Sequence, residues 1–297
     1  IAKLVLNDKE KAIMEANDGK YHTAAPLDLF NMIDQFVQIA GRGGMKELQA
    51  DVIRMCLRGI VHYHDVLRDG VVQLDEPESE LLFLCAIIND CDNIGDNLDT
   101  QIEEQHREML EELDEELLED RLDEVRIECH SLSQYAIGMI RRVIFQDLGD
   151  VESQLFNEDW ESSESLEILL ETIDDYLGDF VDRLVNLSYL TLVGYSFNEC
   201  IVLYTTNLLD IFVKKDKQGA RMKRKSLSKE EVDLVRRDLD SIRSSFAAHI
   251  EDGEKAAKRL FKQQWQMTDA LVAVLTKNCD DLEQQVFVSI RTELGLT

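Results

Sequence analysis

The sequence is poor in the two residues that most often interrupt helices. Its 297 residues include 2 prolines and 14 glycines, whereas average usage would give roughly 15 and roughly 21. All-β sandwiches and barrels need many tight turns, and nucleotide-binding α/β cores need glycine-rich loops. The shortage therefore argues against both classes and favours long helices. A hydrophobic content of 44% is enough for a folded core.

Basic residues are also scarce. The chain has 32 lysines and arginines against 60 aspartates and glutamates, which gives a formal net charge of −28. A surface this acidic repels phosphate backbones, so we expect no nucleic acid as a general partner.

Signals for disulfides, secretion and membrane spans are missing as well. There is no CxxC pair among the cysteines, so we interpret them as reduced core residues of a cytosolic protein. These cysteines are Cys56, Cys85, Cys91, Cys129, Cys200 and Cys279. The chain begins at Ile1 without a signal-peptide pattern, which suggests a fragment of a larger protein. The uncharged run 184–198 is shorter than the about 20 residues of a spanning helix, so we expect a buried helix there.

Helical periodicity runs along almost the whole chain, and we find no alternating strand pattern. We predict helices over 4–16, 26–40, 45–68, 77–130, 132–148, 163–213, 228–250, 253–276 and 279–294. Pro26 and Pro77 stand at helix starts, Gly70 is expected to end a helix, and Gly194 to interrupt one. Ser228 and Glu231 have the spacing of a capping box.

These predicted helices indicate an all-α fold. We expect an elongated rod of stacked antiparallel helical bundles, with one bundle over 1–160 and a second over 161–297.

The patterns that come nearest to a metal or phosphate site are incomplete. His62 and His64 stand two apart, so on a helix they point about 200° apart and cannot bind one ion. Glu103 and His106 form half of a di-iron bundle motif, and we find no second copy. The segment 41–46 lacks the spacing of a phosphate-binding loop. We therefore predict no catalytic residue, no cofactor and no metal, with a di-metal helical-bundle enzyme as the alternative from another class.

Two segments have strongly biased charge. The stretch 103–128 contains 13 acidic residues, and it is either a solvated helix face or a docking surface for a basic partner. The segment 214–225 has the opposite charge, with Asp216 as its single acid. Its basic residues are Lys214, Lys215, Lys217, Arg221, Lys223, Arg224 and Lys225.

Two interpretations of this basic segment stay open. It is either a loop that balances charge within an acidic protein, or a contact for an acidic membrane surface or a partner. Near an anionic bilayer each such charge contributes about 1 kcal/mol.

Two stretches resemble a known family. The apolar helix 82–91, with Ala86, Asn89 and Cys91, resembles a helix of exocyst complex component 3. A helix with Val202 and Tyr204, a basic linker, and a helix with an aspartate, an aliphatic residue and a phenylalanine are similar to the tail of that family. The residues that fit this last helix are Asp238, Ile242 and Phe246.

The resemblance implies the C-terminal region of a helical-rod tethering subunit. The expected function is that of a non-enzymatic scaffold of the exocyst, which docks secretory vesicles at the plasma membrane before fusion. The implied partners are other exocyst subunits and SNARE proteins, and the implied location is cytoplasmic, peripheral at exocytic sites. The alternative within this fold is a paralogous adaptor in membrane or actin remodelling.

Overall fold

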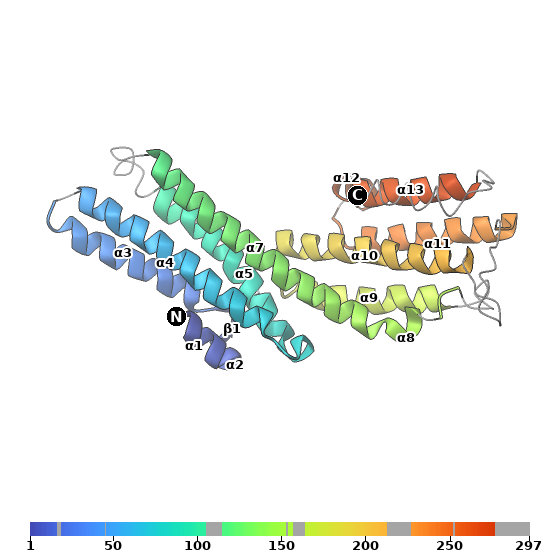
Figure 1. Ribbon diagram of the computed structural model, residues 1–297, viewed down its shortest axis with the longest axis horizontal. Helices are drawn as coiled ribbons and strands as arrows, with labels where there is room; N and C mark the ends of the chain where they lie inside the picture. The colour runs from blue at the N-terminus through green and yellow to red at the C-terminus, as the bar shows by residue number, and fades with distance from the viewer. Residues whose placement is uncertain are drawn as a thin grey trace. The chain divides into compact units, whose positions relative to one another are not determined.

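The computed structural model describes residues 1–16, 19–44, 46–104, 115–152, 154–156, 164–212, 227–251 and 253–276. The chain forms two compact units, 1–143 with 180–189, and 144–179 with 190–297 (Figure 1). Among the described helices, none combines the length and the apolar character that a membrane span requires. The division predicted from the sequence, 1–160 and 161–297, stays a prediction.

The first unit is a helical bundle with a small hairpin near its start. Its elements in chain order are α1 (Ala2–Asn7), α2 (Lys9–Ala12), β1 (Ile13–Glu15), β2 (Tyr21–Thr23), α3 (Ala25–Gly41), α4 (Lys46–Val72), the 3-10 turn η1 (Pro77–Glu80), α5 (Leu81–Asn97), the π-helical η2 (Leu98–Glu104) and most of α7 (Glu115–Asp147). The two strands pair antiparallel, with Met14 opposite His22. As predicted, the fold is built almost entirely of helices.

Helix α5 lies at the centre of this unit. Every residue from Phe83 to Cys91 is buried, and so is Ile94. A helix that is apolar on nearly all sides is stable in water only when neighbours cover all of its faces. Strand β2 and helix α3 both pack on α5, and α3 also packs on α4.

Asn89, on the buried α5, joins two segments that are far apart in sequence. Its Nδ2 donates hydrogen bonds to the carbonyl of Tyr21 at 2.9 Å and to that of Arg183 at 2.7 Å. Its Oδ1 accepts from the Val185 N–H at 3.0 Å. Buried backbone groups outside regular structure need such partners. The side-chain amide of Asn89 therefore supplies hydrogen-bond partners for backbone groups of two segments. These are the hairpin and the turn between α9 (Ser165–Val181) and α10 (Asn186–Phe212).

The next residue, Asp90, anchors the end of β2. Its carboxylate accepts hydrogen bonds from the Thr23 N–H at 3.0 Å and the Thr23 hydroxyl at 2.5 Å. The His22 Nδ1 lies 3.7 Å from Asp90 Oδ1. Burial raises the pKa of the Asp90 carboxyl, and the nearby His22 and the hydrogen bonds from Thr23 act in the opposite direction.

The second unit is a bundle of helices around an aromatic core. It consists of the end of α7, α8 (Gly149–Glu152), α9, most of α10, α11 (Lys229–Ala248), α12 (Glu254–Leu260) and α13 (Lys262–Thr276). The Phe197 ring of α10 stacks on Phe246 of α11 with centroids 4.7 Å apart, and meets Phe261 and Trp265 edge to face. The Tyr204 hydroxyl donates to the Asp238 carboxylate at 2.7 Å. These contacts fix α10 against α11 and the start of α13.

The capping box at α11 is confirmed. The Ser228 hydroxyl accepts from the Glu231 N–H at 3.2 Å, and the Glu231 carboxylate accepts from the Ser228 N–H at 2.6 Å. The helix starts predicted at Pro26 and Pro77 are also confirmed. Pro26 stands in the first turn of α3, and Pro77 in the first turn of η1.

Three predictions of where helices begin or end are wrong in this part of the chain. Residues 4–16 do not form one helix, because α1 ends at Asn7 and the chain pairs as a hairpin from Ile13. The helix predicted over 77–130 leaves α-helical geometry after Asn97, whose side chain bonds to the Asn93 carbonyl at 2.8 Å. Asparagine side chains compete for backbone groups in this way. The break predicted near 131 is absent, because α7 runs through it.

Gly70, predicted to end a helix, and Gly194, predicted to interrupt one, both lie inside continuous helices. Gly70 is within α4, where an added Cβ would collide with the Leu6 side chain of α1. Gly194 is within α10, where an added Cβ would lie 3.0 Å from the Phe261 ring. The missing side chain therefore permits close packing at both positions, and the break between α9 and α10 falls at 182–185 instead.

We expect Asp90→Asn to weaken the pH dependence of stability. A buried carboxyl with a raised pKa stabilises the fold most below the unfolded pKa of about 3.9, and that contribution is lost as the pH rises through the folded pKa. Asparagine retains a hydrogen-bond acceptor and does not ionise. The unfolding free energy of the variant relative to the native protein should therefore increase as the pH rises from about 4 through the raised folded pKa, by about 1.4 kcal/mol per unit of pKa shift.

Urea denaturation of both proteins across that pH range measures the difference. Asp92 and Asp238 also have pKa values raised by burial, but they are common to both proteins. Asp96→Asn, at an exposed position of the same helix, is the matched control. If the difference in unfolding free energy between Asp90→Asn and the native protein does not change with pH, the pKa of Asp90 is not raised in the folded state.

Candidate interaction surfaces

The basic segment 214–225 lies outside the described residues. Helix α10 precedes it and ends at Phe212, and the capping box at Ser228 follows it. The membrane or partner contact through its seven lysines and arginines therefore stays a prediction from the sequence.

The acidic stretch 103–128 is described only in its last part. In that part Glu119, Asp120 and Asp123 are exposed. Glu124 is ion-paired with Arg121 of the same helix, and Glu128 with Arg68 of α4. This portion is a solvated helix face with local ion pairs.

The two histidines of α4 lie on different faces, as their spacing predicts. His62 is exposed, whereas His64 is buried with Nδ1 3.0 Å from the Ile60 carbonyl oxygen and Nε2 3.3 Å from the Cys129 sulfur. Burial lowers the pKa of His64 to about 4, so it is neutral at pH 7. His106 lies outside the described residues. Within the described part of the chain, no three His, Cys, Asp or Glu side chains are grouped to hold a metal ion.

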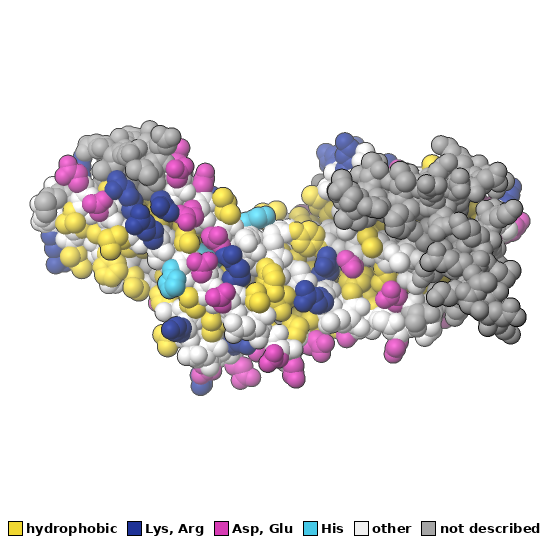
Figure 2. All heavy atoms as spheres, viewed as in Figure 1, with side chains coloured by type: hydrophobic (Ala, Val, Ile, Leu, Met, Phe, Trp, Pro, Cys, Tyr) yellow, Lys and Arg dark blue, Asp and Glu magenta, His cyan; other side chains and the backbone are white. Residues whose placement is uncertain are grey.

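A long apolar groove runs between α3 and α4. It has a volume of about 840 Å³, and most of its lining is apolar. The side chains from α3 include Leu29, Met32, Phe36 and Ile39, and those from α4 include Leu48, Val52, Met55, Cys56 and Tyr63. Figure 2 shows apolar side chains gathered on the surface over these two helices.

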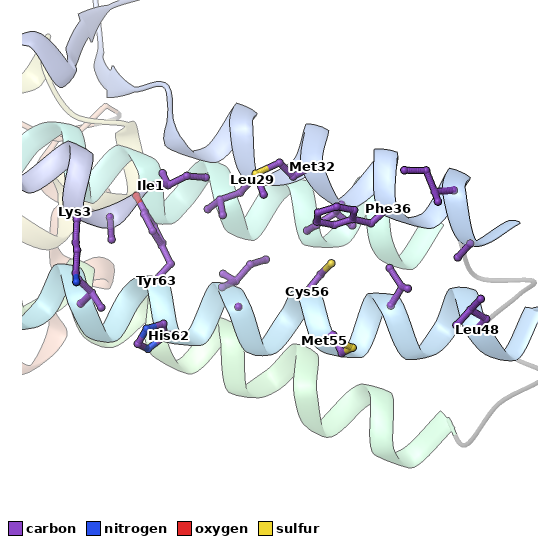
Figure 3. A pocket seen from close by; sticks show the side chains of 18 residues that line it. Ile1, Lys3, Leu29, Met32, Phe36, Leu48, Met55, Cys56, His62 and Tyr63 are labelled. Atoms are coloured by element: carbon purple, nitrogen blue, oxygen red, sulfur yellow. The ribbon is translucent and has the colours of Figure 1, made fainter. Parts of the chain in front are cut away.

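The close view shows how the two helices form the groove. Met32 and Phe36 extend from α3 toward α4, and Cys56 extends from α4 toward them (Figure 3). The opposite side of the same pair is buried through Phe30 and Val37 of α3 and through residues of α4. These α4 residues are Ala50, Ile53, Leu57 and Leu67.

Two apolar faces on one helix pair are unusual for an outer layer, because an outer helix ordinarily presents charged residues to water. Several groove residues are large and exposed, with Ile39 at 59% and Met55 at 70% of their full accessible surface. Contiguous exposed apolar patches mark interaction sites. The apolar residues of 27–40 extend beyond the buried side of the helix, but their periodicity alone does not show which apolar side lacks cover.

Cys56 differs from the other described cysteines. It lines the groove and is half-buried, whereas Cys85, Cys91, Cys129 and Cys200 are buried. Burial raises the pKa of Cys85, Cys129 and Cys200 to about 12. The expectation of reduced core cysteines is met by the four buried residues, while Cys279 lies outside the described residues.

Comparison with known proteins identifies a family and a similar solved structure. The family model described as exocyst complex component Sec6 matches residues 5–292. The crystal structure of the C-terminal domain of the exocyst subunit Sec6p is similar to this chain with a TM-score of 0.79 at 13% identity, and the match covers 98% of this chain and 76% of that chain. At this identity the likeness shows a shared fold, which agrees with the predicted helical-bundle class. Sec6 is exocyst subunit 3, so the resemblance to exocyst proteins is confirmed.

We expect Cys56 to be the most reactive of the described thiols. A maleimide at about pH 7.5 should modify Cys56 at least about tenfold faster than Cys85, Cys91, Cys129 or Cys200, because those four require local unfolding. Mass spectrometry of peptides after timed labelling measures each rate, in a Cys279→Ser background. Cys56→Ala is the control, and a buried cysteine that reacts as fast as Cys56 would refute the described packing.

Proposed function

The chain belongs to the exocyst component Sec6 family, and from this premise we propose that it acts as a non-enzymatic scaffold in the docking of secretory vesicles at the plasma membrane. The observation that carries the proposal is the extent of the family match. It spans residues 5–292, so it includes both compact units and is not limited to one short motif.

The packing of the described residues supports a scaffold. Several buried polar side chains form hydrogen bonds that hold elements of the fold together. Asn89 and Asp90 bind the hairpin, and Asp238 binds Tyr204. Burial shifts the pKa of the described thiols upward and that of His64 downward, which opposes formation of a thiolate–imidazolium pair. A surface formed by long helices is suited to hold several partners at once.

The partners we propose are the other exocyst subunits and SNARE proteins. The exocyst family is one of vesicle tethering proteins, and its members act within an assembly. We place the site of action on the cytoplasmic side of the plasma membrane, at sites of exocytosis.

We propose a membrane or partner contact for the basic segment 214–225. Seven cations within twelve residues form a local positive region in a chain of net charge −28. Such a segment is attracted to anionic lipid headgroups, and the attraction weakens with increasing salt.

The full-length protein, tagged and purified from its own cells, should recover the other exocyst subunits as its main partners. Mass spectrometry of the purified material identifies them, and the tag expressed alone is the control. Recovery of actin-remodelling proteins without exocyst subunits would instead favour a paralogous adaptor and would reject the proposal.

Reversal of three charges in the basic segment tests its role. Lys223→Glu, Arg224→Glu and Lys225→Glu together should weaken binding to phosphatidylserine vesicles on the order of a hundredfold, since each removed cation contributes about 1 kcal/mol. Vesicle cosedimentation measures the effect, and pull-down with SNARE proteins is done with the same variant. The matched control reverses three exposed cations of α12, Lys255, Lys258 and Arg259. If vesicle and SNARE binding both stay at the native level, the segment is only an internal charge balance.

A further inference from the structure

The groove between α3 and α4 is lined by two mostly apolar rows with heptad spacing. Along each row, successive lining residues are three and four positions apart in alternation. The α3 row is Leu29, Met32, Phe36 and Ile39, and the α4 row is Leu48, Val52, Met55, Gly59, His62 and Val66. Alternating steps of three and four residues are the spacing of a coiled-coil seam, where the apolar side chains of a further helix pack.

The dimensions and the lining of the groove suit a helix. The α4 row extends from Leu48 to Val66, which at about 1.5 Å per residue is about 27 Å of helix. Two neighbouring helices leave a groove into which the side-chain ridges of a third can pack. Phe36, Ile39 and Met55 are large and exposed, whereas a pocket for a small molecule encloses most of its ligand. The lining therefore favours an occupant that is itself a helix with an apolar stripe.

Gly59 leaves an opening in the middle of the α4 row. A Cβ added at Gly59 would meet no neighbouring group of the described residues within 4 Å, whereas one added at Gly70 would collide with Leu6. Glycine inside a helix is less stable than alanine. A missing side chain in an exposed row forms a hole into which a large side chain of an incoming helix can insert.

The charges at the groove are positive in a chain that is strongly acidic. None of the described residues that line the groove is acidic, and Lys3 lines the end near His62 (Figure 3). Arg58 is exposed and stands three residues after Met55 and four before His62, so it lies beside the α4 row. Figure 2 shows basic side chains next to this apolar area.

Two acids that flank the same row already have partners within α4. Asp51 is ion-paired with Arg54 at 2.6 Å, and Asp65 with Arg68 at 3.5 Å. Arg58 has no ion pair with any residue in the part of the chain that the structure describes. Its charge is therefore available to an acidic residue of the occupant.

We propose that the α3–α4 groove binds one amphipathic helix of another protein, with an apolar heptad stripe and acidic residues along its flanks. A large apolar side chain of that helix fills the hole at Gly59, and its acidic residues lie beside Arg58 and Lys3. This surface is separate from the segment 214–225 and does not depend on the role in vesicle docking, so either proposal can fail without the other.

Two synthetic peptides of about three heptads, each long enough to fill the groove, test the occupant. Both have leucine at positions a and d, and they differ in having glutamate or lysine at positions e and g. Like charges at e and g keep each peptide from pairing with itself. The chain as a whole, at −28, attracts the lysine peptide and repels the glutamate peptide. Tighter binding of the glutamate peptide therefore requires local positive charge.

We expect the full-length protein to bind the glutamate peptide with a Kd at least about tenfold lower than that of the lysine peptide. Fluorescence anisotropy of labelled peptides at about 0.15 M salt, where the Debye length is about 8 Å, measures both values. Equal affinities, or tighter binding of the lysine peptide, overturn the proposal. If neither peptide binds, the groove does not take a helix of another protein, and the proposal is likewise wrong.

The variant Gly59→Leu tests the position of the peptide. It should weaken binding of the glutamate peptide at least about tenfold, because leucine fills the hole. Gly178→Leu is the matched control, since Gly178 is also an exposed glycine within a helix whose added Cβ meets no neighbour within 4 Å. Gly59→Leu and Gly59→Ala should both raise the urea midpoint, because both residues favour helix over glycine. Native affinity in Gly59→Leu would place the peptide elsewhere and overturn the proposal.

Charge reversal tests the acidic flanks. Lys3→Glu with Arg58→Glu should abolish the preference for the glutamate peptide. Lys255→Glu with Lys258→Glu on α12 makes the same change in net charge at exposed positions and should preserve it. A preference that survives the first pair of substitutions contradicts the assignment of these charges. Self-association of the full-length protein that Gly59→Leu abolishes would identify a second copy as the occupant and would also overturn the proposal.

Discussion

The first unit depends on the hydrogen bonds of one buried amide. Asn89 stands on α5, a helix that is covered on nearly all sides, and it satisfies backbone groups of Tyr21, Arg183 and Val185. Those groups belong to a hairpin and to an interhelical turn, where regular structure supplies no partner. An apolar residue of similar size would leave them unpaired in the core, and each would cost about 1–3 kcal/mol. The helix that is most apolar therefore also carries the polar contacts that position its neighbours.

The surrounding polar residues extend the same principle. Asp90 holds the end of β2 through Thr23, and the Ser188 hydroxyl donates to Asp92 at 2.7 Å. Asn89, Asp90 and Asp92 of α5 thus bind segments that lie 67 to 96 residues away in the chain. Such contacts favour one register of packing, since apolar surfaces alone tolerate small shifts.

The sequence was sufficient to predict the helical class and the capping box, because these depend on local periodicity and spacing, and two of its segments resemble the exocyst family. It was not sufficient for features that depend on a distant neighbour. Gly194 and Gly70 look like helix ends in sequence, and only the positions of Phe261 and Leu6 explain them as close contacts. The hairpin did carry a local signal, Asp18-Gly19, which is typical of short turns between strands. The groove could not be predicted, since periodicity shows that α3 is apolar but not that one of its sides lacks cover.

The groove follows from the same apolar content that builds the core. In α3, Phe30 and Val37 face inward, while Met32 and Phe36 face the groove, so the pair α3–α4 has the composition of a middle layer. A middle layer needs a covering layer, because exposed apolar area is unfavourable in water in proportion to its size. Charged residues at 32, 36 or 55 would be typical of an outer surface, and the apolar residues that stand there instead form an exposed apolar face of the kind that marks interaction sites.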